Sequence, residues 1–211
     1  MTTLKSLILT TTLTIPLALT GCPSEPVAAG PAMALQAEGS ALSFIARKND
    51  EADVPGKLTN LGGALQVPDG DLSKATGTIE IGWFGGVDTA NPARDSNLTT
   101  IFFGALDDLA PKGQVNLNSL RVKTPTLDVG QSTVGNAFVD VDAGVSMTDI
   151  TVPVTVTRNA ESQYTFALGE GVEVSIEQLG MNDRKATLLQ VCQHKSVSDA
   201  VRMAGTFVFG Q

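Results

Sequence analysis

Cys192 and His194 are the two side chains in this sequence best placed to hold a metal ion, because a thiol and an imidazole lie two residues apart. A structural zinc site takes four such ligands. His194 is the only histidine, and Cys22 is the only other cysteine. We therefore expect no metal site, and we interpret Cys192 as a structural thiol packed in the core.

Catalytic arrangements are equally scarce. A Ser-His-Asp triad would have to use His194, and no Gly-x-Ser-x-Gly turn is present to hold a serine nucleophile. The sequence contains no GxGxxG or P-loop motif for a nucleotide. Its carboxylates do not fall in a context that would raise a pKa for acid–base chemistry. We therefore predict a protein that is not an enzyme, with no catalytic residues and no cofactor.

Cys22 ends a segment that has the order of an export signal. Lys5 is the only charge before it, and the residues after Lys5 are mainly apolar residues and threonine. This stretch is shorter and more polar than the roughly 20 apolar residues that span a bilayer. It closes with Leu19-Thr20-Gly21-Cys22, which resembles the lipobox of bacterial lipoproteins. The resemblance implies cleavage after residue 21 and lipid attachment, diacylglycerol and palmitate-type chains, at Cys22. The alternative is an ordinary secretory signal with an incidental cysteine.

The sequence is divided into three predicted segments: a lipoprotein signal peptide at 1–21, the lipidated cysteine and a flexible tether at 22–37, and one domain at 38–211. The tether is rich in Pro, Ala and Gly, as expected for a spacer. Several acyl chains together anchor a protein firmly to a membrane. Pro23 and Ser24 replace the aspartate associated with inner-membrane retention. We expect a cell-envelope protein anchored in the outer membrane and facing the periplasm.

The charge balance excludes one class of partner. The formal net charge is −8, and loss of Lys5 with the signal segment makes the mature chain more negative. An acidic protein repels phosphate backbones, so we expect no nucleic-acid partner. With Cys22 acylated, Cys192 has no partner for a disulfide within the chain.

The domain itself has the alternation of β-strands. In the segment 76–84, Ile79, Ile81 and Trp83 fall on one face. In the segment 150–157, Val152, Val154 and Val156 do the same. Further strands are predicted at 42–48, 57–67, 115–123, 126–141, 163–168, 171–177 and 204–209. Eight or nine strands can close a barrel or build a sandwich.

Three local features complete this pattern. Pro153 lies inside a strong strand and has no N–H, which predicts an edge, a bulge or a break there. The spacing of apolar residues predicts short helices at 93–106 and 182–193, the second with Asn182 as its N-cap. Long helical segments between strands are missing, which excludes a doubly wound fold.

The stretch from Ile79 to Leu117 resembles the YceI-like family. The family pattern is an acidic residue and threonine, then Arg-Asp, a leucine, two phenylalanines, and a proline before the next strand. These elements are, in order, Asp88-Thr89, Arg94-Asp95, Leu98, Phe102-Phe103 and Pro111. Their order and spacing match the family.

The resemblance implies an all-β fold: a lipocalin-like antiparallel β-barrel of about eight strands with one or two short helices. It also implies an apolar lipid inside the barrel, a polyisoprenoid or an isoprenoid quinone, and it leaves a homodimer open. Only 5% of the residues are aromatic and 21 are glycine, so small inner side chains could leave space for a ligand. The predicted ligand-binding residues are Ile79, Ile81, Trp83, Arg94, Phe102, Phe103, Val152, Val154 and Val156.

Several of these residues have a second interpretation. Phe102 and Phe103 could cover a lipid tunnel or belong to an ordinary core, and Trp83 fits a core position. Arg94 could bind a lipid phosphate, or Arg94 and Asp95 could brace their loop through local hydrogen bonds and ion pairs. We therefore predict a membrane-tethered periplasmic binding protein for an apolar lipid. The alternative is a structural or interaction lipoprotein with a filled barrel and no ligand.

Overall fold

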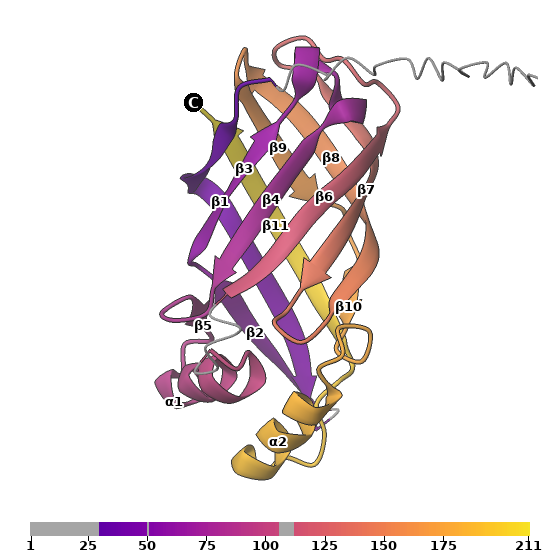
Figure 1. The fold of residues 1–211 in the computed structure, drawn as a ribbon. Helices are drawn as coiled ribbons and strands as arrows, with labels where there is room; N and C mark the ends of the chain where they lie inside the picture. The colour runs from indigo at the N-terminus through magenta and orange to yellow at the C-terminus, as the bar shows by residue number, and fades with distance from the viewer. Residues whose placement is uncertain (1–29, 50, 106–111) are drawn as a thin grey trace, which may run out of the picture.

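A closed antiparallel β-barrel forms the wall of the molecule (Figure 1). The structure is a computed structural model that describes residues 30–49, 51–105 and 112–211. Around the barrel, the strands follow the order β1, β3, β4, β6, β7, β8, β9, β11 and back to β1. Three further strands extend this wall: β2 beside β1, β5 beside β2, and β10 beside β11. The predicted lipocalin-like barrel of about eight strands with short helices is confirmed.

The elements have the following bounds. The strands are β1 (Met33–Lys48), β2 (Ala52–Leu58), β3 (Leu61–Gln66), β4 (Thr76–Gly82), β5 (Val87–Asp88), β6 (Lys112–Val122), β7 (Ser132–Asp142), β8 (Met147–Ala160), β9 (Gln163–Leu168), β10 (Val172–Ser175) and β11 (Ala200–Gly210). The helical elements are the 3-10 turns η1 (Pro68–Gly70) and η2 (Leu72–Lys74), the α-helices α1 (Pro92–Asn97) and α2 (Asn182–Cys192), and the π-helical turn η3 (Leu98–Phe102).

The alternation of side chains along each strand separates an apolar interior from a polar outer surface. On β4, Ile79 and Ile81 belong to the interior. The side chains that alternate with them are polar: Thr78 donates a hydrogen bond to Asn116 on the neighbouring strand β6 (3.0 Å), and Glu80 forms an ion pair with Lys112. The same division repeats around the barrel.

The two ends of the barrel differ. At one end, which we call the closed end, the described chain starts at Gly30 beside Val67 and Pro68, and the C-terminal strand finishes (Figure 1). The turns η1 and η2 also lie there. The opposite end, which we call the helical end, carries α1, η3 and α2 (Figure 1).

A layer of buried aliphatic side chains fills the barrel at the closed end. Its members are less than 3% exposed: Leu65, Leu72, Leu120, Leu127 and Val156. Leu72 enters this layer from η2, whose backbone is held by a hydrogen bond from Leu72 N to Pro125 O (2.8 Å). Asp71 caps η2 by accepting hydrogen bonds from Ser73, and these bonds lower the pKa of the Asp71 carboxyl.

Several predicted strand boundaries need correction. Strand β1 starts at Met33, whose side chain is buried, so the barrel begins before the boundary predicted at residue 38. The strand predicted at 57–67 is broken between β2 and β3: Thr59 N donates to Gly86 O in the loop after β4, and Asn60 O accepts a hydrogen bond from Gly82 N at the end of β4. The strand predicted at 126–141 begins only at Ser132.

The helices also differ from prediction in detail. The segment predicted as one helix at 93–106 is a short α-helix followed by a π-helical turn that ends at Phe102. Asn91, whose side chain accepts a hydrogen bond from Arg94 N, caps α1. Asn182 is not the N-cap of α2; that position is Met181, and no side chain caps it. Among the described residues, no helix has the length and apolar character needed to cross a membrane.

Pro153 occupies a position in β8 where one side of the strand loses its partner. The pairing between β8 and β9 ends at Val154, while the pairing with β7 continues through Pro153. The carbonyl of Pro153 accepts a hydrogen bond from Gly169 N just beyond the end of β9 (2.7 Å). A residue without an N–H is tolerated there because no ladder hydrogen bond is required of it. The predicted edge is therefore limited to the stretch of β8 where β9 has ended.

Candidate functional site

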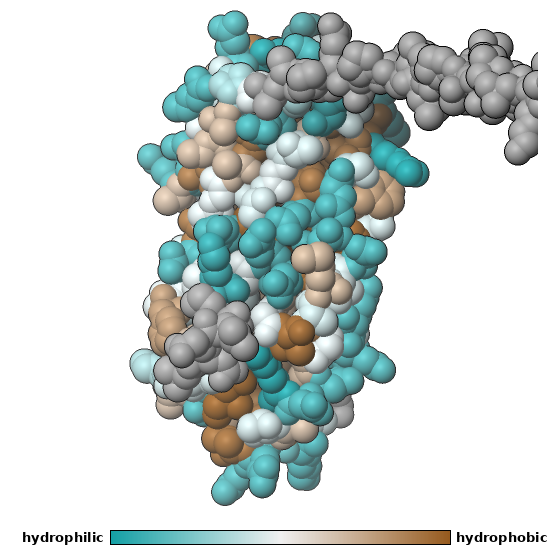
Figure 2. Space-filling model, in the orientation of Figure 1, coloured by the Kyte–Doolittle hydropathy of each residue, from teal (hydrophilic) through white to brown (hydrophobic). Residues whose placement is uncertain are grey.

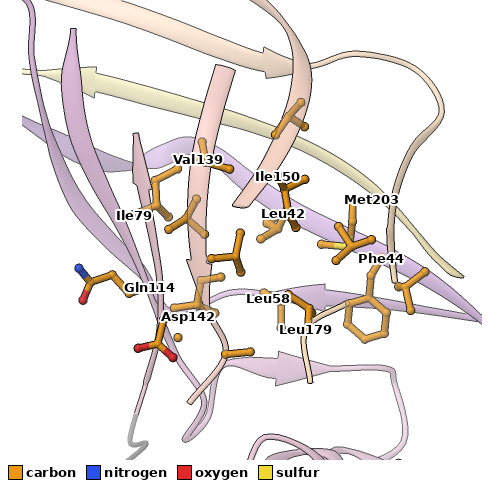
Figure 3. A pocket seen from close by; sticks show the side chains of 18 of the residues that line it. Leu42, Phe44, Leu58, Ile79, Gln114, Val139, Asp142, Ile150, Leu179 and Met203 are labelled. Carbon is orange, nitrogen blue, oxygen red and sulfur yellow. The ribbon is translucent and has the colours of Figure 1, made fainter. Parts of the chain in front are cut away.

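The interior of the barrel between the closed end and the helices is an apolar cavity of about 290 Å³. Its wall comes from nearly every strand, and Figure 3 shows Leu42, Ile79, Val139 and Ile150 around this space. Polar residues are few in this lining: Thr78, Gln114 and Asp142. Gln114 and Asp142 both have hydrogen bonds elsewhere, to Asn116 and to Gly144 N.

Partial exposure distinguishes much of the cavity wall from the packed core. Ile79, Val115, Leu117, Val141 and Ile150 lie on inward-facing positions, yet each is only partly buried. Native cores are packed to crystal-like density, so partial exposure of inward aliphatic groups indicates space that no side chain fills. An apolar void of this kind suits an apolar molecule better than it suits water.

Aromatic rings cover the cavity at the helical end. The rings of Trp83 and Phe103 are stacked with centroids 4.0 Å apart, and Phe102 contacts Phe103 edge to face at 5.1 Å. Gly113 allows this arrangement, because a Cβ atom there would lie 2.3 Å from the Trp83 ring. All three rings line the cavity. The Nε1 atom of Trp83 is buried without a hydrogen-bond partner in the part of the chain that the structure describes.

A second apolar cluster joins α2 to this cover. Met181, Ile176 and Ala143 are buried together, and Phe102 and Phe103 pack against them. Leu188 of α2 also reaches the cavity. This cluster gives the helical end an apolar underside that faces the barrel interior.

Arg184 ties the cover to the barrel through backbone carbonyl groups. Its guanidinium donates to Phe103 O at 2.6 Å and to Gly144 O at 3.3 Å, which connects α2, η3 and the turn between β7 and β8. Gly104 makes room for it, since a Cβ atom there would lie 2.6 Å from the guanidinium, and its φ is +62°. Charge-assisted bonds of this kind are stronger than neutral ones.

A carboxylate fixes the loop on the other side of α2. Asp199 accepts hydrogen bonds from the Ser175 hydroxyl (2.6 Å) and from Glu177 N (2.9 Å), and Lys185 of α2 lies 3.8 Å away. The bond from Ser175 is the main reason that the pKa of Asp199 is lowered. Asp199 thus holds the connection from β10 to α2 near the cavity.

The structure places most of the predicted site residues on the cavity wall: Ile79, Ile81, Trp83, Phe102, Phe103, Val152 and Val154. Val156 does not line the cavity. It shares the inward face of β8 but lies in the filled layer of the closed end, because alternation fixes the face of a residue and not its height in the barrel. Cys22 lies outside the described residues.

Arg94 also does not line the cavity. It lies on α1, where its backbone N–H takes part in the cap of the helix. Its neighbour Asp95 accepts hydrogen bonds from the backbone and hydroxyl of Thr89, which agrees with the bracing interpretation for Asp95. The lipid-phosphate interpretation of Arg94 finds no support in this placement.

Cys192 and His194 lie at the helical end without forming a metal site. The thiol of Cys192 is half-buried and accepts a contact from Asn97 Nδ2 at 3.5 Å. Burial lowers the pKa of His194, and the nearby cations Lys48 and Arg94 lower it further. Within residues 30–49, 51–105 and 112–211, no three His, Cys, Asp or Glu side chains form a cluster that could hold a metal ion.

Sequence reasoning missed much of the cavity wall. The missed residues are mainly on β1, β6, β7 and β11, and they include Phe44, Val115, Leu117, Val139, Val141 and Met203. The alternation in these segments is interrupted: the pairing of β6 with β7 shifts between Leu117 and Ser119. These residues could have been identified from strand pairing, because a neighbouring strand with a known inward face shows which residues of its partner also face inward.

Together the fold and the cavity define a class: a lipocalin-like antiparallel barrel with an apolar interior, filled at one end and covered by short helices at the other. Neither the comparison with protein-family models nor the comparison with curated proteins finds a match. Solved structures do match, and they carry the fold of YceI-like proteins.

Three of these structures set the level of similarity. A polyisoprenoid binding domain from Saccharophagus degradans, described as implicated in plant cell wall breakdown, has a TM-score of 0.69 at 14% identity over 84% of this chain and 97% of that chain. Burkholderia cenocepacia BcnA has a TM-score of 0.61 at 14% identity over 82% and 98%. The Campylobacter jejuni YCEI protein has a TM-score of 0.54 at 14% identity over 76% and 86%. The predicted resemblance is thus confirmed at the level of the fold.

Proposed function

We propose that this protein is a binding protein for an apolar lipid of the isoprenoid type, a polyisoprenoid or an isoprenoid quinone, and that it is not an enzyme. The observation that carries the proposal is the cavity of about 290 Å³ inside the barrel, whose lining is almost entirely apolar. Burial of a hydrocarbon chain against such a surface is favourable, and the surface offers few groups that could take part in catalysis. The polyisoprenoid binding domain from Saccharophagus degradans shares the fold, which supports the same class of ligand.

The size of the cavity favours a single flexible chain. At about 290 Å³ it lies near the lower end of the range for small-molecule sites, roughly 300–1,000 Å³. A lipid with two acyl chains would need more room. A long isoprenoid would place part of its chain in the cavity, and the rest would extend toward the helical end, because the closed end is filled by Leu72, Leu120 and Val156.

The proposal includes a lipid anchor at Cys22 and a location in the cell envelope. Its support is the sequence: a short apolar segment after Lys5 and the ending Leu19-Thr20-Gly21-Cys22. The residues after the cysteine favour the outer membrane, with the barrel in the periplasm. The anchor would keep a binding protein for a water-insoluble lipid at a membrane.

The test uses the mature chain, residues 22–211, with Cys22→Ser to remove the site of lipid attachment. The purified protein is extracted with organic solvent, and the extract is analysed by mass spectrometry. We expect about one isoprenoid molecule per protein. A parallel sample of Val152→Phe, which fills part of the cavity, should lose most of this lipid.

Val134→Phe is the matched control, because Val134 is a valine on the neighbouring strand β7 that is 45% exposed. It should retain the full amount of lipid. A protein that carries no lipid and takes up neither a quinone nor a polyprenol in solution would overturn the proposal, and would favour the structural lipoprotein with an unused interior. Equal lipid content in Val152→Phe and Val134→Phe would place the ligand outside the cavity.

A further inference from the structure

The start of the described chain and the accessible part of the cavity lie at opposite ends of the barrel. Gly30 lies beside Val67 and Pro68 at the closed end. The cavity reaches the helical end, where its lining comes from η3, α2 and the segment between β10 and α2. Buried leucines block the way through the closed end. A ligand must therefore enter and leave through the helical end, far from the point where the N-terminal segment joins the barrel.

The N-terminal segment is too short to reverse this arrangement. Gly30 is the eighth residue after Cys22. Eight residues span at most roughly 29 Å when fully extended, and roughly 15 Å on average as a flexible coil. The barrel is longer: the 14 residues of β8 extend over roughly 46 Å, or roughly 35 Å along the axis at the usual strand tilt. A lipid on Cys22 cannot bring the helical end down to its own bilayer while the barrel stands on its closed end.

The side of the barrel offers little that would hold it flat on a membrane. Among the described residues, the exposed large apolar side chains lie toward the two ends: Val129 and Val134 toward the closed end, and Phe84, Val145, Met147 and Val191 toward the helical end. On the face in Figure 2, hydrophilic side chains cover much of the wall and a hydrophobic patch lies at the helical end.

We propose that the mouth of the cavity faces away from the membrane that carries the anchor, so that the protein exchanges its lipid with a second lipid surface and not with its own bilayer. This inference rests on the proposed anchor and the proposed apolar ligand. It assigns the four exposed apolar residues of the helical end to the side that meets the second surface. The protein then acts as a carrier between two surfaces.

The orientation can be measured with the natural tryptophan. Trp83 is the only tryptophan and lies at the helical end. The mature chain with Cys192→Ser has Cys22 as its only thiol and is coupled through it to a maleimide lipid in vesicles that contain dansyl-labelled lipid. We expect weak energy transfer from Trp83 to the dansyl groups, because the helical end is held away from the bilayer.

The matched control moves the attachment to the other end. In the variant Cys22→Ser, Cys192→Ser, Val191→Cys, the only thiol lies on the exposed face of α2. Energy transfer should then be several-fold stronger. Equal transfer for the two attachments would overturn the inference. This measurement needs no bound lipid, so it decides the orientation even if the proposed function fails.

A second arm tests the exchange itself with an isoprenoid quinone. The protein coupled through Cys22 should take quinone from added vesicles faster than from the vesicles that carry it. An insertion of about 20 Gly and Ser residues before Gly30 raises the maximum reach to roughly 95 Å and should remove this preference. Uptake from the carrying vesicles that is as fast with the natural tether as with the long one would also overturn the inference.

Discussion

The closed end and the helical end of this barrel are built from the same strands and the same kinds of side chain, yet only one of them is filled. At the closed end, Leu72 from η2 and Leu120 from β6 are less than 3% exposed. Leu117 lies three residues before Leu120 on the same strand β6, in the direction of the helical end, where it borders the cavity and is only partly buried. The difference comes from what covers each end of the barrel.

The cover of the closed end inserts a side chain into the barrel, whereas the cover of the helical end lies across it. The turn η2 directs Leu72 inward and is held by a backbone bond to Pro125. At the helical end, stacked rings and α2 form a roof that is tied by Arg184. One end is therefore densely packed, and the other leaves apolar space beneath its cover.

The largest expected effect is a difference in stability loss between two leucine substitutions on β6. Leu120→Ala should lower the free energy of unfolding by about 3 kcal/mol, because it creates a cavity in a filled layer. Leu117→Ala, the same substitution on the same strand, should cost only about 1 kcal/mol, since the leucine already borders empty space. Urea denaturation of both variants measures the difference. Equal losses would mean that the surroundings of Leu117 are packed as densely as those of Leu120.

The cover of the helical end gives the second prediction. Arg184→Met removes the donors to Phe103 O and Gly144 O, and the free energy of unfolding should fall by about 1.5 kcal/mol. Release of a fluorescent isoprenoid probe, followed by stopped flow, should become several-fold faster because the roof opens more readily.

Arg121→Met serves as the control for this substitution. Arg121 lies on the outer wall of β6 over the ring of Phe138. Its loss should cost roughly 0.5 kcal/mol and leave the release rate unchanged. If Arg184→Met lowers stability but leaves the release rate as it was, the arginine supports the fold without controlling access to the cavity.

The sequence was sufficient for the fold class and for the faces of the clearest strands. Ile79 and Ile81, and Val152, Val154 and Val156, are all on inward faces as their alternation predicts. What alternation cannot supply is the height of a residue along the barrel axis, which depends on strand pairing. Alternation therefore groups Val156 with the predicted ligand-binding residues Val152 and Val154, although Val156 belongs to the filled closed end.

Other parts of the site were hidden for different physical reasons. The shift in pairing near Leu117 lets both Leu117 and Leu120 face inward, which a period of two does not predict. Leu72 lies in a three-residue turn that is too short to have a periodicity. The role of Arg184 depends on contacts with backbone carbonyls of two segments that are distant in the sequence, and no local sequence pattern predicts such contacts.

The smallest expected effect concerns the charge at the helical end. His194 is the only histidine, so its pKa can be followed by one resonance in an NMR titration. Burial, and then Lys48 and Arg94, hold this pKa below the ordinary value of about 6.5. Arg94→Gln should raise this pKa without restoring the ordinary value, because the burial remains. Arg121→Gln, on the barrel wall, should leave it unchanged.

The sign of the stability effect follows from the lowered pKa. Well above pH 6.5 the histidine is neutral in both the folded and the unfolded chain, so it adds no pH dependence there. As the pH falls below that value, the unfolded chain binds a proton more readily than the folded one, and stability is lost until the folded pKa is passed. His194→Gln should therefore remove a small loss of stability between neutral and mildly acidic pH. If stability falls with pH in this variant as it does in the natural protein, the loss comes from other groups. If the loss becomes smaller, acid sensitivity is connected to the helical end and not to the closed end.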